Sequence, residues 1–168
     1  YGGIAFRHLF TEQGVGQLLL FIKHWRSEGQ PSNILRCALA WCQLAAGTGT
    51  SILSDVTTPL PHLESKWITG VRNYLRHISG KFQLDSEYIP PLQRERDLYL
   101  MDAILAYSGF SSADICRFDY CRRYLQVVTL SDISTADGAR LDPIMQKGDL
   151  SLLSSRTKWL QFTQDRPD

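Results

Sequence analysis

Basic and aromatic side chains recur together between residues 112 and 125, at the spacing of one helix face. Arg117, Tyr120, Arg123 and Tyr124 share that face, and the opposite face is apolar, with Ile115, Phe118, Cys121 and Leu125. Guanidinium groups bind phosphate oxygens and tyrosine rings stack on bases, so the pattern favours contact with nucleic acid. The alternative for each ring is ordinary packing against a neighbouring element.

A second group of basic residues lies between His62 and Lys81, where four Lys or Arg stand against one Glu. Lys66, Arg72 and Arg76 fall on the polar side of this segment, at spacings that suit successive phosphates. A basic solvent-facing side is also common in proteins that bind no nucleic acid. We expect Tyr120 and Tyr124 to act as stacking platforms, and we expect phosphate contacts at Lys66, Arg72, Arg76, Arg117, Arg122 and Arg123.

No comparable pattern indicates catalysis. The sequence has no G-x-S-x-G elbow, no H-E-x-x-H pair and no complete phosphate-binding glycine loop, and its four histidines are scattered. Its cysteines form two C-x4-C pairs, Cys37 with Cys42 and Cys116 with Cys121. In a helix, five residues turn a side chain by about 140°, which disfavours a shared zinc ion and indicates buried reduced thiols. We expect no catalytic residue, metal or cofactor in this segment.

The composition is that of one globular domain. The chain has 168 residues, with 18 Lys and Arg against 17 Asp and Glu, and 43% of its residues are hydrophobic. No apolar run is long enough to span a bilayer, so no membrane partner is expected. The chain begins at Tyr1 without a methionine or a signal-like segment, and we expect an intracellular fragment of a longer protein. A net charge of +1 predicts that the isolated domain binds nucleic acid weakly.

Apolar spacing predicts a mostly α fold, a single bundle of about five helices. The expected helices run from Thr11 to the turn at Ser27–Gln30, from Pro31 to Gly47, from Pro61 to Gly80, from Gln93 to Tyr107, and from Ser111 onward. The first two are apolar on nearly all sides, which predicts that both are buried. The Gly-, Ser- and Thr-rich segment 47–60 is expected to be a loop, with room for one short strand.

The pattern changes after the fifth helix. Residues 125–130 favour a β conformation, and Asp137-Gly138 between two short arms predicts a small β-hairpin. We expect one domain over residues 1–142 and a partly ordered tail over 143–168. The apolar residues of that tail include Leu152, Leu153, Trp159 and Phe162.

Two segments resemble non-LTR retroelement reverse transcriptases. The stretch Gly2-Gly3-Ile4-Ala5-Phe6-Arg7-His8-Leu9 resembles the Gly-Gly-aliphatic-Gly-aliphatic segment that closes the polymerase region in that family, with Ala5 in place of the family's glycine. The stretch YLQVVTLSDISTADGARLDP, residues 124–143, is similar to a segment that follows the reverse transcriptase in such polyproteins. Together they identify most of the chain with the post-palm region, like a thumb or connector.

The resemblance implies a helical, thumb-like region that grips RNA or an RNA/DNA template–primer duplex through its backbone, next to an upstream palm and fingers. The parent protein is then an RNA-directed DNA polymerase. This chain lacks the family's aromatic-x-Asp-Asp motif, because Phe118-Asp119-Tyr120 has no second carboxylate. The fragment itself cannot polymerise, and Mg²⁺ is expected only in the missing palm. The alternative is a helical protein–protein interaction module, which docks through the stripe of the third helix or through the tail.

Overall fold

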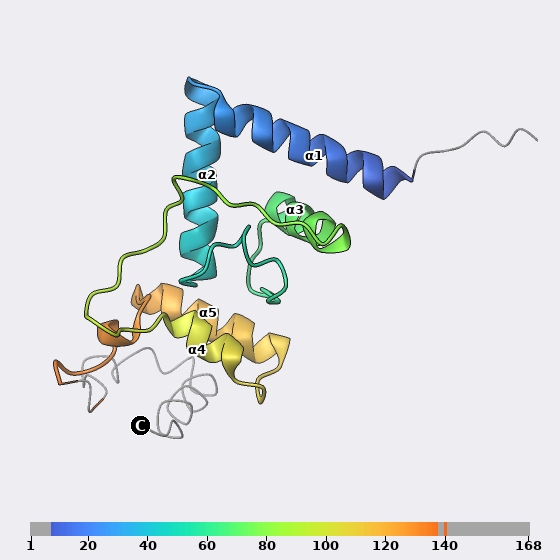
Figure 1. Cartoon of the computed structure of the whole chain (residues 1–168). Helices are drawn as coiled ribbons and strands as arrows, with labels where there is room; N and C mark the ends of the chain where they lie inside the picture. The colour runs from blue at the N-terminus through green and yellow to red at the C-terminus, as the bar shows by residue number, and fades with distance from the viewer. Residues whose placement is uncertain (1–7, 138–139, 141–168) are drawn as a thin grey trace, which may run out of the picture. The chain divides into compact units, whose positions relative to one another are not determined.

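The computed structural model describes residues 8–137 and 140, and this part of the chain is mostly α-helical (Figure 1). Its helices are α1 (Leu9–Arg26), α2 (Gln30–Ala46), α3 (Lys66–His77), α4 (Leu100–Ala106) and α5 (Ser112–Leu125), and a 3-10 turn follows at Leu130–Asp132. The described residues contain no β-strand, and Tyr99 and Thr129 form an isolated antiparallel bridge. None of these helices is both long and apolar enough to cross a membrane.

The described residues divide into two compact units. The first comprises the chain up to Ala45, Thr50–Thr58 and Leu63–Ile89, and it holds α1, α3 and nearly all of α2. The second comprises Ala46–Gly49, Pro59–His62 and the chain from Pro90, and it holds α4 and α5. The predicted domain boundary at residue 142 lies outside the described residues, so the division into residues 1–142 and a tail stays a prediction.

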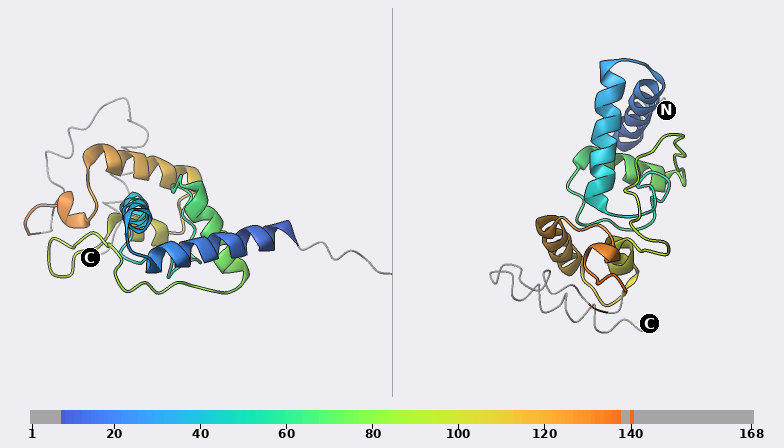
Figure 2. Two further views of the ribbon diagram at one scale, coloured as in Figure 1. Left: turned by 90° about the horizontal axis from the view of Figure 1, so that it is seen from above. Right: turned by 90° about the vertical axis from the view of Figure 1, so that its left-hand side faces the viewer.

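In the first unit, α3 lies beside the first half of α1 (Figure 2). Gly14 marks the closest approach, because a Cβ atom at this position would lie 2.2 Å from the ring of Tyr74. A side chain there would force the two helices apart, so the glycine permits this packing. Further along α1, the ring of Phe21 stacks on Trp25 and on Phe82, with centroids 5.7 Å and 5.0 Å apart. These aromatic contacts fix the second half of α1 to the unit.

The prediction that α1 is buried on nearly all sides is wrong. Its buried residues are Gly14, Phe21 and Trp25, whereas Leu19 and Leu20 are 62% and 59% exposed. The described residues therefore cover one side of this helix and leave apolar side chains on the other. The expectation that α2 is mostly core fails in the same way at Ile34, Cys37 and Trp41, which are exposed.

The end of α2 and the loop after it match the sequence pattern. Gly47 follows the last helical residue with a φ of +67°, the left-handed conformation that a glycine C-cap supplies. Residues 50–58 form no strand, and Ile52 and Leu53 within them are fully buried. The amide of Gln43 holds this loop, since it donates to the carbonyl of Thr50 and accepts the backbone N–H of Ile52, both at 3.0 Å.

The core of the second unit lies between α4 and α5, which run side by side (Figure 1). Its buried members are apolar residues from both helices and from the segment after α5: Leu100, Met101, Ile104, Phe118, Val127 and Ile133. The predicted start of α5 at Ser111 is confirmed. The Ser111 hydroxyl accepts the Asp114 N–H at 3.3 Å, and the Asp114 carboxylate accepts the Ser111 N–H at 3.2 Å, which makes a capping box.

The helix predicted over residues 93–107 begins only at Leu100 and ends at Ala106. Residues 93–96 form a bend and a turn, and the backbone next to Leu100 pairs with the segment that follows α5. Leu100 donates its N–H to the carbonyl of Val128 at 3.0 Å, and Leu130 donates its N–H to the carbonyl of Leu98 at 2.9 Å. These two bonds flank the bridge at Tyr99 and Thr129 and replace the first turns of the predicted helix.

The hairpin predicted around Asp137-Gly138 falls partly outside the described residues. On its N-terminal side the chain forms the 3-10 turn Leu130–Asp132 rather than a strand. Across the predicted turn, Thr135 donates its N–H to the carbonyl of Arg140 at 2.8 Å. The described arm before the Asp-Gly pair, residues 133–136, forms no strand, so that part of the prediction is wrong, and the arm after it lies largely outside the described residues.

Candidate nucleic-acid interface

The outward side of α5 carries the basic and aromatic residues that the sequence places there. We call Arg117, Tyr120, Arg123 and Tyr124 the α5 outer face. All four are exposed, the two tyrosines to 61% and 58%, while Phe118 and Cys121 on the opposite side are buried. The predicted orientation of this helix is therefore confirmed.

The four residues of the α5 outer face lie within one arc of the helix. At about 100° and 1.5 Å per residue, they span an arc of about 120° and a length of about 10 Å along the axis. The two tyrosines are one turn apart, and the two arginines lie on either edge of the arc. Their side chains can therefore contact one extended ligand together.

Carboxylates behind the α5 outer face hold its two arginines in place. Arg123 Nε lies 2.8 Å from the Asp119 carboxylate, and the side chains are 38% and 6% exposed. Arg117 lies 3.4 Å from the carboxylate of Asp114, with 56% of its own side chain exposed. These ion pairs reduce the net charge of the surface and orient the guanidinium groups, whose other N–H groups can still donate.

The prediction that Arg122 contacts phosphate is wrong, because its side chain is only 3% exposed. One turn after Phe118, it lies on the inner side of α5 and donates to the carboxylate of Asp119 from Nε at 3.1 Å and from a terminal nitrogen at 2.7 Å. Its guanidinium also lies against Gly47, where a Cβ atom would stand 2.7 Å from the Arg122 Cζ. Arg122 is a structural residue of the second unit.

The prediction that Arg72 faces solvent is also wrong, because this residue is only 4% exposed. Its guanidinium donates to three carbonyls of the loop over residues 50–58: those of Ile52, Asp55 at 2.7 Å and Thr58 at 2.6 Å. A loop without regular structure leaves buried carbonyls unpaired, and one guanidinium with five donors can satisfy several of them. The helical pattern alone does not show which neighbouring backbone needs donors.

The remaining basic residues of α3 differ from each other. Arg76 is exposed, but its Nε donates to the carbonyl of Val56 at 2.9 Å and a terminal nitrogen donates to Asn73 at 3.3 Å. Lys66, at the first position of α3, is exposed. The expected row of three phosphate contacts on α3 is thus reduced to Lys66 and part of Arg76. Because α3 and α5 belong to different units, a surface common to both stays a prediction.

The cysteines and His62 supply no chemical site among the described residues. In each C-x4-C pair one cysteine is exposed, Cys37 or Cys116, and its partner is buried, so the two thiols point apart as the helical spacing predicts. The prediction of buried thiols is therefore wrong for Cys37 and Cys116. No group of three metal-binding side chains occurs in this part of the chain. His62 is buried and its Nε2 lies 3.0 Å from the carbonyl of Ala46, while Nδ1 has no hydrogen-bond partner among the described residues.

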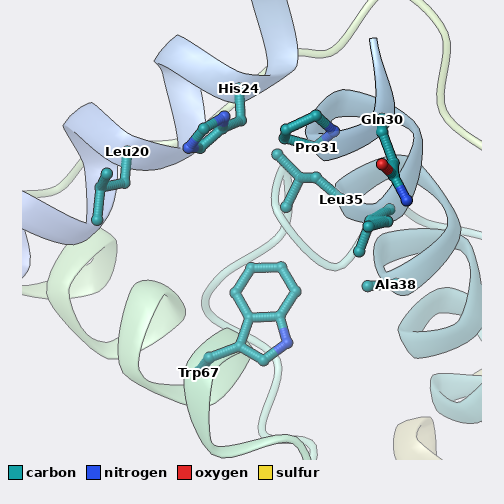
Figure 3. Close-up of a pocket in the computed structure, with 8 residues that line it drawn as sticks. Leu20, His24, Gln30, Pro31, Leu35, Ala38 and Trp67 are labelled. Atoms are coloured by element: carbon teal, nitrogen blue, oxygen red, sulfur yellow. The ribbon is translucent and has the colours of Figure 1, made fainter.

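An open apolar pocket lies in the first unit, between α1 and α2 with Trp67 of α3 at its base (Figure 3). Its volume is about 600 Å³, and its lining consists of Leu20, His24, Gln30, Pro31, Ile34, Leu35, Ala38 and Trp67. Sequence reasoning missed this pocket because it assigned the apolar sides of α1 and α2 to the core. The signal was present in the excess of apolar residues around both helices.

No known protein family, curated protein or solved structure matches this chain.

Proposed function

We propose that this chain is a non-catalytic, nucleic-acid-gripping region of a retroelement reverse transcriptase polyprotein, with the α5 outer face as its contact surface. The observation that supports the proposal is the exposure of Tyr120 and Tyr124 between two outward arginines. The partner is RNA or an RNA/DNA duplex, contacted through the backbone. The upstream palm and fingers supply the polymerase chemistry and hold the Mg²⁺, and the protein acts inside the cell.

The chemistry of the α5 outer face fits this role better than a catalytic one. Arg117 and Arg123 can each donate to a phosphate oxygen while a carboxylate fixes the other side of the guanidinium. Tyr120 and Tyr124 offer rings that form no ring pair among the described residues. In this proposal the predicted turn at Asp137-Gly138 closes the C-terminal side of the domain, which the bond between Thr135 and Arg140 supports.

The number of outward-facing arginines determines the expected strength of binding. With Arg72 and Arg122 buried, two arginines of α5 remain for phosphate. Each phosphate contact contributes a slope of about −0.9 to the dependence of log affinity on log salt for a duplex. We expect weak binding with a slope of about −2 from this face. The neighbouring polymerase region then provides most of the affinity.

The test is a double substitution, Arg117→Ala with Arg123→Ala, measured by fluorescence anisotropy on a labelled RNA/DNA hybrid at several salt concentrations. We expect weaker binding and a slope that flattens by about two units. The matched control removes two exposed basic residues from the last turn of α1, Lys23→Ala with Arg26→Ala. Unchanged affinity and slope in the α5 variant, or an equal loss in the α1 control, would contradict the proposal.

A protein–protein interaction module is the second candidate, and the apolar pocket with exposed Leu20 and Ile34 favours it. In that case Ile34→Glu abolishes binding of the purified upstream polymerase region, measured by calorimetry, and the α5 double substitution has no effect on any interaction. If Ile34→Glu leaves that binding intact, the pocket is not the docking surface and the module loses its support.

A further inference from the structure

We infer that the α5 outer face binds an unpaired stretch of RNA or DNA in preference to a duplex, an inference that rests on the proposed function. The proposed function itself leaves the form of the nucleic acid open. Three features of the second unit favour a single strand over a duplex. They are the spacing of the two tyrosines, the number of outward-facing arginines, and the arrangement of the four residues on the helix.

The tyrosine spacing favours single strands. Tyr120 and Tyr124 are four residues apart on one helix face, about 6 Å along the axis. Bases in a duplex strand are stacked about 3.4 Å apart, so their faces are covered by neighbouring bases and only their edges are open. A tyrosine ring can stack only on a base whose face is free. Two tyrosines one turn apart on this face can therefore each take a base of an extended, unstacked strand.

The charge of the α5 outer face is too small to follow a duplex backbone. A duplex carries one negative charge for about every 1.7 Å of its length, and proteins that grip it present many cations. Here Arg117 and Arg123 are the outward cations, and each has an aspartate behind it. Two other arginines expected to contact phosphate do not face solvent, since Arg72 binds loop carbonyls and Arg122 binds Asp119.

The arrangement of the four residues also favours a single-stranded ligand. The four exposed residues project from one side of one helix, so among the described residues they form a narrow strip along it. A strip of about 10 Å accommodates two or three extended nucleotides, with the arginines at its edges and the rings between them. Stacking then contributes most of the binding, and phosphate contacts fix the direction of the strand.

The experiment uses the 168-residue chain with two labelled probes of equal length, an oligouridine, which stays unstacked, and an RNA/DNA hybrid. We expect the oligouridine to bind more tightly at the same salt concentration. Tyr120→Leu with Tyr124→Leu should weaken oligouridine binding at least about tenfold, because each stacked base contributes strongly, and should leave hybrid binding nearly unchanged. Tyr120→Phe with Tyr124→Phe keeps both rings and should retain the wild-type affinity.

The matched control is Tyr88→Leu, which removes a tyrosine that is 47% exposed in the first unit and should change neither affinity. Tighter binding of the hybrid, or equal loss on both probes in the leucine variant, overturns the single-strand inference. If either of these results is found while hybrid binding still depends on Arg117 and Arg123, the proposed function stands and only the single-strand inference falls. If neither probe binds and the upstream polymerase region binds instead, both fall in favour of the interaction module.

Discussion

Helices α3 and α5 each carry three of the basic residues expected to contact phosphate, yet the two helices place them differently. On α3, Arg72 is buried and Arg76 is bonded to Val56, so the arginines hold a loop. On α5, only Arg122 is buried, and Arg117 and Arg123 remain outside with two tyrosines. The arginines of α3 bind backbone carbonyls of a loop, whereas those of α5 pair mainly with carboxylates of their own helix, and Arg123 donates in addition to the carbonyl of His62 at 3.4 Å.

The difference shows what decides the role of a helical arginine. Residues 50–58 have buried carbonyls without partners in regular structure, and α3 is the helix that supplies donors to them. In α5 the acceptors are Asp114 and Asp119, three or four residues from the arginines they bind. A side chain that pairs within its own helix can keep its outer nitrogens free for a ligand.

The largest effect on stability is expected at Arg72. Replacing it by methionine, Arg72→Met, keeps the apolar stem and leaves the buried carbonyl of Ile52 and the half-buried carbonyls of Asp55 and Thr58 without their donor. We expect the free energy of unfolding to fall by about 4 kcal/mol, measured by urea denaturation. The neighbouring exposed Asn73→Ala is the control and should cost less than about 1 kcal/mol. A loss below about 1 kcal/mol at Arg72 would show that the loop does not depend on it.

A smaller loss is expected when the carboxylate under α5 is removed. Asp119→Ala leaves Arg122 charged in a buried position, and we expect unfolding to become easier by about 3 kcal/mol. Arg122→Met should cost less, because Asp119 keeps its ion pair with Arg123. Urea denaturation of both variants measures the order. If Arg122→Met is the more harmful change, the account of the charges beneath α5 is wrong.

A third and weaker effect concerns pH. Burial lowers the pKa of His62, although the bond to Ala46 opposes this, so the folded protein keeps the ring neutral below the ordinary pKa of about 6.5. The unfolded chain then binds a proton that the folded chain does not. The contribution of His62 to stability is fully present above about pH 6.5 and is lost as the pH falls below that value.

The variant His62→Gln can still donate to the carbonyl of Ala46 and cannot titrate. We expect the difference in unfolding free energy between wild type and variant to change between pH 7 and about 5.5, measured by urea denaturation at each pH. Glu87, whose pKa is raised by burial, acts in the opposite direction in both proteins and cancels in the difference. A difference that does not change with pH would show that His62 is not the titrating group.

Local signals in the sequence predicted the helix ends that depend on local chemistry. The Ser111 cap and the glycine at position 47 act through their own backbone neighbours, and both are confirmed. The outer face of α5 was predictable for the same reason, since helical spacing alone separates Tyr120 and Tyr124 from Phe118.

What local signals could not predict depends on distant segments. Arg72 points inward because a loop 14 to 20 residues earlier needs its donors. The predicted helix at residue 93 begins only at Leu100, because the segment after α5 pairs with its backbone. Leu19 and Leu20 are exposed because the described residues cover only one side of α1. Each of these outcomes is set by a partner that helical periodicity does not reveal.

The central claim is that nucleic acid contacts the α5 outer face, and photocrosslinking tests it most directly. The 168-residue chain is bound to RNA that contains 4-thiouridine, irradiated and digested, and the crosslinked peptides are identified by mass spectrometry. We predict crosslinks at Tyr120 and Tyr124, lost in the leucine variants. Crosslinks confined to α3 or α1, or crosslinks that persist unchanged in those variants, would contradict the account.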